Sequence, residues 1–287
     1  MVVHWCGTGL SAIPGLKKLI MDGNDVIVWN RTVSKAMRAL EDVQVTICEF
    51  DIKALEEKLA PKDIIVSMLP GDWHVPLAEL AISKKTHFVS SSYISPEMRN
   101  LNNAAIEAEV ALINEIGLDP GIDHLMAHKL VKDFKKSELI NAETAVSFLS
   151  YCGGVPKTPN EFKYKFSWSP LGVLKALKSP SRSIKNFNKF EAKRPWDAIT
   201  SYSAPLDNPE EFEVYPNRDS LPFIDQYDFN KNWKIKRFVR GTLRLRGWAK
   251  AWAEIFKEIE TLNGETGEKR LIEMSEELWR NNAYGEH

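Results

Sequence analysis

The strongest constraint in this sequence is a regular alternation of short apolar runs with longer amphipathic segments, which extends from the first residues to about Glu115. The apolar runs lie at Val2–Cys6, Val26–Trp29, Val45–Cys48, Ile64–Met68, His87–Ser90 and Val110–Asn114. The amphipathic segments lie at Leu10–Met21, Ser34–Glu41, Ile52–Leu59, Pro76–Ser83 and Pro96–Glu109. Strand followed by helix, repeated in this way, predicts a parallel sheet with helices on both faces. The nearly apolar strand runs are typical of such a doubly covered sheet.

The pattern changes near residue 120, where Asp119-Pro120-Gly121 interrupts the alternation. Beyond it we expect a helix at Ile122–Phe134, strands at Thr144–Tyr151 and Lys236–Leu245, a loop at Pro180–Pro195 and a helix at Trp248–Glu260. The prediction is an α/β chain in which residues 1–120 form a Rossmann-type, doubly wound parallel sheet that binds a dinucleotide. Residues 121–263 are predicted to form an α+β substrate domain with a mixed or antiparallel sheet. Residues 264–287 are predicted to be a charged, partly helical tail with a frayed end.

Composition argues against several classes of partner. The 38 Lys and Arg residues nearly balance the 39 Asp and Glu residues, so no global field attracts nucleic acid or anionic lipid. The basic and aromatic stretch Lys231–Lys250 resembles a nucleic-acid patch, but its alternation within a predicted strand argues against that function. No run approaches the roughly 18 apolar residues that a membrane helix needs. The three cysteines imply no disulfide framework, which favours a reducing cytoplasm.

A glycine fingerprint lies at the first predicted strand-to-helix turn. Gly7-Thr8-Gly9-Leu10-Ser11-Ala12 matches the pattern G-x-G-x-x-A between a strand and a helix. In this pattern Gly7 makes the tight turn, Gly9 lets a pyrophosphate approach the backbone, and Ala12 allows close helix packing. We therefore predict that this turn and the helix start bind a dinucleotide, through Gly7, Gly9, Leu10, Ser11, Ala12 and Ile13. A tight turn without a ligand is the alternative.

The end of the second predicted strand indicates which dinucleotide is bound. An NAD-dependent enzyme usually carries an acid about 20 residues after the glycines, where it binds the ribose 2′-hydroxyl. This chain has Asn30, Arg31 and Thr32 there, and Arg31 can form a forked pair with a 2′-phosphate. NADP is therefore the predicted cofactor. The alternative is that Arg31 is a solvated residue at a helix start.

Several longer motifs carry a family resemblance. They are Ser91–Pro96, Asn114–His124, Ser150–Gly154, Lys165–Ser169, Tyr215–Ser220 and Arg240–Arg244. In their residues and in their order along the chain, these motifs closely resemble the glutamate-forming, NADP-dependent saccharopine dehydrogenase (saccharopine reductase) family of lysine metabolism. The resemblance runs from Gly7 to about Trp248, and the Asn114–His124 string is its most specific part.

The resemblance implies a reversible oxidoreductase reaction on a CH–NH bond. Saccharopine, NADP and water give glutamate, aminoadipate semialdehyde and NADPH. The resemblance also implies further cofactor contacts at Asp51, Ile52, Met68, Leu69, Pro70, Leu118, Pro120 and Ser169.

Saccharopine is a polycarboxylate, so its site needs cations. Alternation in Phe238–Arg246 puts Arg240, Thr242 and Arg244 on one face of a strand. Without the resemblance, a solvated basic face is the favoured interpretation. With it, Thr242, Leu243 and Arg244 are assigned to substrate binding, and so is Arg218, whose alternative is a turn-stabilising ion pair with Asp219.

Four further residues are candidates for the reacting centre. Ser92 and Tyr93 follow a predicted sheet strand, so their hydroxyls are expected to hold the substrate near the nicotinamide. Asp119 is expected to pair with the substrate ammonium or to assist proton transfer. Tyr93, Asp119 and Cys152 are therefore the predicted catalytic residues. The alternatives are a polar turn at Ser92 and Tyr93, a turn-forming Asp119 before proline, and an inert Cys152.

No metal site is predicted, although His124 and His128 share a helix face, because no third ligand is evident. The sequence departs from the family pattern at Asn30, at the short stretch Lys157–Lys163, and after Trp248, where family sequences continue further. The alternative is therefore a family member that has lost its activity or reduces a different imine. Arginines at the substrate positions argue against a polyamine imine. The resemblance also implies a homodimer.

Overall fold

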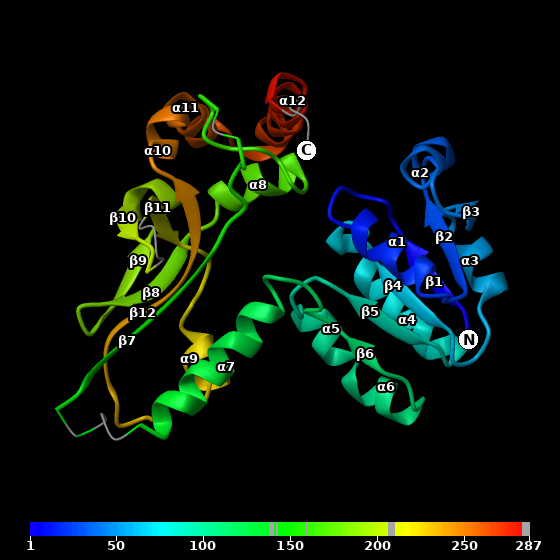
Figure 1. Ribbon diagram of the computed structural model, residues 1–287, viewed down its shortest axis with the longest axis horizontal. Helices are drawn as coiled ribbons and strands as arrows, with labels where there is room; N and C mark the ends of the chain where they lie inside the picture. Colours follow the sequence, from blue (N-terminus) through cyan, green and yellow to red (C-terminus); the bar gives the residue numbers. More distant parts are fainter. Residues whose placement is uncertain (138–140, 142, 159, 206–209, 283–287) are drawn as a thin grey trace. The chain divides into compact units, whose positions relative to one another are not determined.

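The computed structural model divides the chain into two compact units, Met1–Ile122 and Asp123–His287 (Figure 1). It describes residues 1–137, 141, 143–158, 160–205 and 210–282. Among the described residues, no helix is long and apolar enough to cross a membrane.

Unit 1, Met1–Ile122, is built on a sheet of six parallel strands. Their order is β3 (Thr46–Glu49), β2 (Val26–Asn30), β1 (Val3–Cys6), β4 (Ile64–Ser67), β5 (His87–Ser90) and β6 (Leu112–Ile113). This is the Rossmann order, with the switch between β1 and β4. The predicted fold of the first 120 residues is therefore confirmed.

Helices cover both faces of this sheet. They are α1 (Ile13–Met21), α2 (Val33–Ala39), α3 (Ile52–Lys58), the short 3₁₀ turn η1 (Gly71–Trp73), α4 (His74–Lys84), α5 (Pro96–Asn100) and α6 (Asn102–Glu107). On β2, Val28 packs in one apolar cluster and its neighbour Trp29 packs in the other. Because successive strand residues point to opposite faces, the strand is buried on both sides.

Unit 2, Asp123–His287, contains a mixed sheet of six strands. They are β7 (Ala145–Cys152), β8 (Ser181–Lys185), β9 (Asn188–Ala192), β10 (Thr200–Ser203), β11 (Glu211–Pro216) and β12 (Lys234–Leu245). The long strand β12 is parallel to β7, beside which it runs in Figure 1, and antiparallel to β11 and β8. The mixed sheet predicted for the second half is confirmed.

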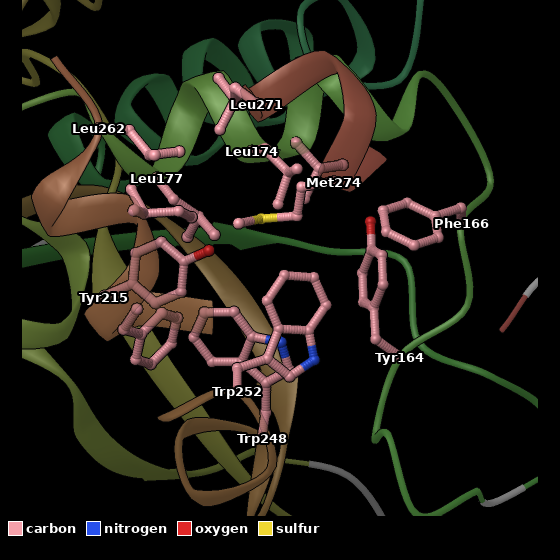
Figure 2. Packing of buried hydrophobic residues seen from close by; sticks show 13 residues of the cluster. Tyr164, Phe166, Leu174, Leu177, Tyr215, Trp248, Trp252, Leu262, Leu271 and Met274 are labelled. Atoms are coloured by element: carbon pink, nitrogen blue, oxygen red, sulfur yellow. The ribbon is translucent and has the colours of Figure 1, made fainter. Parts of the chain in front are cut away.

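The helices of unit 2 pack in two cores. They are α7 (Ile122–Lys135), α8 (Pro170–Leu177), the 3₁₀ turn η2 (Pro195–Ala198), α9 (Pro222–Gln226), α10 (Trp248–Ala251), α11 (Ala253–Thr261) and α12 (Gly264–Asn282). One core joins α7 and α9 to β7 and β12 through Phe148, Tyr227 and Phe238. The other surrounds Trp248 and Trp252. Figure 2 shows these two indole rings below Leu174, Leu177 and Met274, with Tyr164 on one side and Tyr215 on the other.

Two segments differ from the prediction. The expected loop at residues 180–195 is instead the hairpin of β8 and β9 followed by η2. The expected tail begins with the 19-residue helix α12, which places Leu271 and Met274 in the aromatic core. Residues 283–287 of that predicted tail lie outside the described residues.

Candidate functional site

The glycine turn after β1 has the geometry that a phosphate-binding loop requires. Gly7 has a φ of 103°, and a Cβ there would lie 2.9 Å from the carbonyl oxygen of Met68. Only glycine fits this position, and the close approach brings Gly7 against Met68 and Leu69 at the end of β4. A Cβ on Gly9 would meet nothing within 4 Å. The turn is therefore tight at Gly7 and open at Gly9.

The start of α1 offers unpaired donors beside this turn. The hydroxyl oxygen of Thr8 is buried and has no hydrogen-bond partner among the described residues. The N-cap residue Ala12 supplies no side-chain cap, and Pro14 follows in the first turn. Leu10 and Ser11 are exposed, and Ile13 is half-buried. A buried orphan hydroxyl next to an uncapped helix N-terminus fits an anionic phosphate.

The Asn30 side chain forms two hydrogen bonds within unit 1, and its predicted contact with the cofactor stays a prediction. Its side-chain oxygen accepts a hydrogen bond from the Thr8 amide at 3.2 Å, and its amide nitrogen donates to the Thr32 carbonyl at 2.9 Å. Both polar groups of Asn30 are thus used within the protein, where they tie the end of β2 to the glycine turn. Arg31 and Thr32 are exposed, and Arg31 has no ion pair in the described part of the chain. The Arg31 guanidinium is therefore available to bind a phosphate group at the position where dinucleotide-binding domains contact the ribose.

The remaining cofactor candidates of unit 1 lie at other strand ends. Asp51 caps α3, because its carboxylate accepts hydrogen bonds from the amides of Lys53 and Ala54, and Ile52 is the first residue of that helix. Met68, Leu69 and Pro70 follow β4 directly, and Met68 Sδ lies 3.8 Å from the Ser91 hydroxyl. These strand ends lie on the carboxyl edge of the sheet, where open α/β sheets bind ligands.

Ser92 follows β5 and contacts a histidine that the sequence analysis missed. His74 Nε2 lies 2.8 Å from the Ser92 hydroxyl, and His74 Nδ1 lies 3.0 Å from the Ser67 hydroxyl. His74 is the first residue of α4 and is buried, and that burial lowers the pKa of its imidazole. A histidine soon after a strand end was the available signal, but nothing in the sequence pairs it with Ser67 and Ser92.

Tyr93 and Asp119 are brought together by the structure. The Tyr93 hydroxyl donates a hydrogen bond of 2.6 Å to the Asp119 carboxylate. The loop that carries Asp119 folds back on itself, because the Ile122 amide bonds to the Gly117 carbonyl and Gly121 has a φ of 145°. Pro120 is buried, but Leu118 is 65% exposed. Asp119 therefore has the buried Pro120 on one side in the sequence and the exposed Leu118 on the other.

The arginines of β12 do not form the solvated row that is the alternative interpretation. Arg240 is buried, forms an ion pair with Asp123, and stacks over the Phe223 ring at 4.0 Å. Arg244 is also buried. Arg246, beyond the end of the strand, is exposed. The ion pair of Arg240 with Asp123 connects β12 to the start of α7. Arg244, in contrast, is buried without a carboxylate partner among the described residues.

Arg244 is a buried guanidinium in an aromatic cage. It is 7% exposed, and its guanidinium carbon lies 4.9 Å from the Tyr164 ring, 5.3 Å from Trp248 and 5.8 Å from Tyr215. Its Nη1 donates a hydrogen bond to the Leu243 carbonyl at 3.2 Å, and its Nε has no partner among the described residues. No carboxylate of the described chain pairs with it. Glu213, its neighbour on β11, instead caps α10 through the amides of Gly247 and Ala249.

The other predicted residues of unit 2 have mixed placements. Thr242 and Cys152 are half-buried partners across β12 and β7, whereas Leu243 points to the opposite face from Thr242. Arg218 is exposed on its loop, where Asp219 pairs with Arg182 at 2.6 Å. Ser169 caps α8 by accepting a hydrogen bond from the Gly172 amide.

The histidines of α7 contact an aromatic residue. His124 Nδ1 lies 2.8 Å from the Tyr227 hydroxyl, and the His128 ring packs edge-on against Tyr227 at 5.4 Å. The described residues contain no group of three or more His, Cys, Asp or Glu side chains that could hold a metal ion.

The sequence matches two family models. One is the saccharopine dehydrogenase NADP binding domain, over residues 3–113, and the other is the saccharopine dehydrogenase C-terminal domain, over residues 117–283. Saccharopine dehydrogenase (NADP(+), L-glutamate-forming) from Pyricularia oryzae is 36% identical over 249 residues, covering 84% of this chain and 54% of the relative. The protein of the same name from Saccharomyces cerevisiae is 36% identical over 250 residues, with the same shares. The chain spans about half the length of the curated relatives it matches.

Solved structures agree with these matches. Apo histidine-tagged saccharopine dehydrogenase (L-Glu forming) from Saccharomyces cerevisiae has a TM-score of 0.76 and 33% identity, covering 91% of this chain and 60% of that chain. A homospermidine synthase from Legionella pneumophila in complex with NAD has a TM-score of 0.56 and covers 90% of this chain and 68% of that chain. At 11% identity it shows a shared fold alone.

Proposed function

The chain belongs to the saccharopine dehydrogenase family, and from that premise we propose that it interconverts saccharopine, NADP and water with glutamate, aminoadipate semialdehyde and NADPH. The matches confirm the predicted family resemblance and, through the NADP binding domain at residues 3–113, the predicted cofactor. They give no support to the alternative of a family member without activity.

The observation that carries the proposal is the caged guanidinium of Arg244. A buried charge without a counterion is unfavourable, because desolvation removes its hydration and nothing replaces it. Arginine binds carboxylates through two parallel hydrogen bonds, and saccharopine carries three carboxylates. We assign one of them to Arg244, with Thr242 and Arg218 as further contacts. The aromatic rings that surround Arg244 hold its side chain in place, so little rotamer freedom is lost on binding.

The residues of unit 1 fit the cofactor. The open Gly9, the orphan Thr8 hydroxyl and the start of α1 would hold its diphosphate, and Arg31 would hold the 2′-phosphate. The chemistry that NADP supplies when bound is hydride transfer at the substrate carbon next to the secondary amine. Pro70 and Leu69 after β4 and Ser92 after β5 would line the crevice at the carboxyl edge of the sheet.

Tyr93 and Asp119 would act on the substrate nitrogen. The Asp119 carboxylate, which accepts a hydrogen bond from Tyr93, would bind the substrate ammonium or take a proton from the attacking water. Cys152 is proposed to line the site beside Thr242 without forming a covalent bond to the substrate. A cytoplasmic location and a homodimer remain predictions.

The test is a steady-state assay that follows NADPH absorbance with aminoadipate semialdehyde and glutamate, and in reverse with saccharopine and NADP. We expect glutamate to be the preferred amine and NADPH the preferred reductant. Parallel assays replace glutamate with other amino acids and with a diamine. Faster turnover of one of these amines would select the alternative of a different imine substrate. NADPH binding without turnover of any amine would contradict the proposal.

A further inference from the structure

His74 lies in a short chain of hydrogen bonds at the carboxyl edge of the unit 1 sheet. Its Nδ1 faces the hydroxyl of Ser67, the last residue of β4, at 3.0 Å, and its Nε2 faces the hydroxyl of Ser92, just beyond β5, at 2.8 Å. Ser67 and His74 are buried, whereas Ser92 is half-buried. The imidazole thus connects an interior hydroxyl to one that reaches the edge where ligands bind.

The buried serine decides which nitrogen of His74 carries the proton. The neutral imidazole has one N–H donor and one acceptor nitrogen, and the hydrogen-bond network must assign them. In the described chain the Ser67 hydroxyl has His74 Nδ1 as its hydrogen-bond partner and no other. If Nδ1 carried the proton, the Ser67 hydrogen would be buried without an acceptor, which costs about 1–3 kcal/mol. The Ser67 hydroxyl therefore donates to Nδ1, and Nε2–H donates to Ser92.

This assignment leaves Ser92 as a directed donor. Its oxygen already accepts from His74, and in the described chain its hydroxyl hydrogen has no acceptor. Its backbone is also held, because its amide lies 3.4 Å from the Ser90 hydroxyl and its carbonyl accepts from the Glu115 amide at 3.1 Å. A hydroxyl fixed in this way matches a group that only accepts, such as a carboxylate.

We propose that His74 is a positioning residue that, through Nε2–H, orients the Ser92 hydroxyl to donate to a carboxylate of the substrate. The inference rests on the proposed function for the identity of the substrate, but not for the tautomer. The bond from His74 Nε2–H occupies Ser92 as an acceptor, so the Ser92 hydroxyl faces the substrate as a donor. A substrate group that must itself donate at this position is disfavoured.

Two substitutions of His74 separate positioning from packing. His74→Gln keeps a donor near the place of Nε2 and loses the acceptor near Nδ1, whereas His74→Asn keeps polar atoms near Nδ1 and no longer reaches Ser92. We expect Ser92→Ala to raise the KM for saccharopine about tenfold or more, and His74→Asn to raise it about three- to tenfold. His74→Gln should stay within about threefold of the wild type. NADPH affinity, measured by fluorescence, should be unchanged, and thermal melting checks that each variant folds.

The double variant Ser92→Ala with His74→Asn decides the mechanism. If His74 acts through Ser92, the second substitution adds nothing to the KM of Ser92→Ala, because the interaction is already lost. An equal further rise in KM would mean that His74 supports the fold and not the hydroxyl, and so would overturn the proposal. Equal defects in His74→Gln and His74→Asn would also overturn it.

A tautomer measurement tests the inference without relying on turnover. Nitrogen-15 NMR of the His74 side chain at neutral pH should show a protonated Nε2 and an unprotonated Nδ1. Protonation at Nδ1 would contradict the inference even in an active enzyme. If the wild type shows no turnover of saccharopine, the proposed function fails, and the tautomer then decides the inference alone.

Discussion

Arg31 and Arg244 are both cations without a carboxylate partner in the described chain, but their surroundings differ. Arg31 is exposed at the end of β2, where water screens its charge, whereas Arg244 is buried among three aromatic rings. An exposed guanidinium is hydrated without a ligand, but it favours a ligand whose anionic group reaches it. A buried one needs an anion, because its desolvation is otherwise uncompensated. Substitution by alanine is therefore expected to change the choice of cofactor at Arg31 and the affinity for the substrate at Arg244.

Replacing Arg31 should change the choice between cofactors. Arg31→Ala removes a charge-assisted contact to the 2′-phosphate, worth about 1.5–3 kcal/mol, that NAD cannot make. We expect the dissociation constant for NADPH to rise about tenfold to a hundredfold and that for NADH to change little, as measured by fluorescence titration. Arg38→Ala, at an exposed arginine of α2, is the control. Equal weakening of both cofactors would remove the assignment of Arg31.

Replacing Arg244 should affect the substrate and not the cofactor. Arg244→Ala loses a forked contact to a carboxylate, so the KM for saccharopine should rise about tenfold to a hundredfold. Arg244→Lys keeps the charge but not the fork and should recover part of the affinity. Arg246→Ala, at the exposed arginine two residues away, should leave the KM unchanged. If the folded Arg244→Ala protein keeps the wild-type KM, the guanidinium has a packing role only.

Residue chemistry was predictable where it depends on local sequence. The glycine turn, Arg31 and the Asp119 loop could be proposed because their neighbours in the chain set their conformation. The hydrogen bonds of Asn30 and His74 could not be predicted, because their partners Thr8, Ser67 and Ser92 meet them only after the sheet forms. The ion pair of Arg240 with Asp123 joins residues 117 positions apart, so no local pattern signals it.

At the scale of elements, the hairpin of β8 and β9 shows why a strand can escape sequence analysis. Its inward residues in β8 are Ser181 and Ser183, which are buried, so the usual alternation of apolar and polar residues is absent. Its two-residue turn is Asn186-Phe187, with φ values of 50° and 66°, where the common signal would be Asn-Gly. Both strand signals are therefore missing, although the backbone pairing is regular.

The length and packing of helix α12 could not be predicted for a related reason: charged residues and two glycines surround its few apolar positions. Leu271 and Met274, one turn apart, are buried in the aromatic core. Leu271→Ala should lower the free energy of unfolding by about 2–5 kcal/mol, because it leaves a cavity against α8. Ile272→Ala, at a neighbouring position that is 44% exposed, should cost less than about 0.5 kcal/mol. Urea unfolding of the full chain measures both, and equal effects would show that α12 is not docked.

At the scale of the whole molecule, the order of elements was sufficient to predict two architectures but not their cores. The alternation of strands and helices predicts the parallel sheet of unit 1, because each short apolar run forms one strand and each amphipathic segment forms the helix that connects it to the next strand. The sheet of unit 2 depends on β12, which pairs with three strands that are distant in sequence. Pairing at such separations leaves no local signal, so the strand order of unit 2 could not be predicted.

The two units should respond differently to mild acid. Burial lowers the pKa of His4, against the opposing effect of Asp63, and burial also lowers the pKa of His74. Both residues belong to unit 1. An unfolded histidine titrates near pH 6.5, so below that pH the unfolded state binds protons that the folded unit 1 does not. The stability that the two neutral histidines contribute to unit 1 is then fully present above about pH 6.5 and is lost as the pH falls toward their folded-state pKa values.

Hydrogen exchange at about pH 7.5 and about pH 5.5, corrected for intrinsic exchange rates, measures this difference unit by unit. We expect the opening free energies of the β1, β4 and β5 amides to fall over this range, because the two histidines must protonate on unfolding. His74→Gln removes one titrating group and should make the fall shallower, although the value at the higher pH is expected to drop by about 1–3 kcal/mol because the Ser67 hydroxyl loses its acceptor. Carboxylates titrate below this window, so they do not obscure the result. A loss of stability that is the same in both units, or unchanged by His74→Gln, would mean that the buried histidines are not its source.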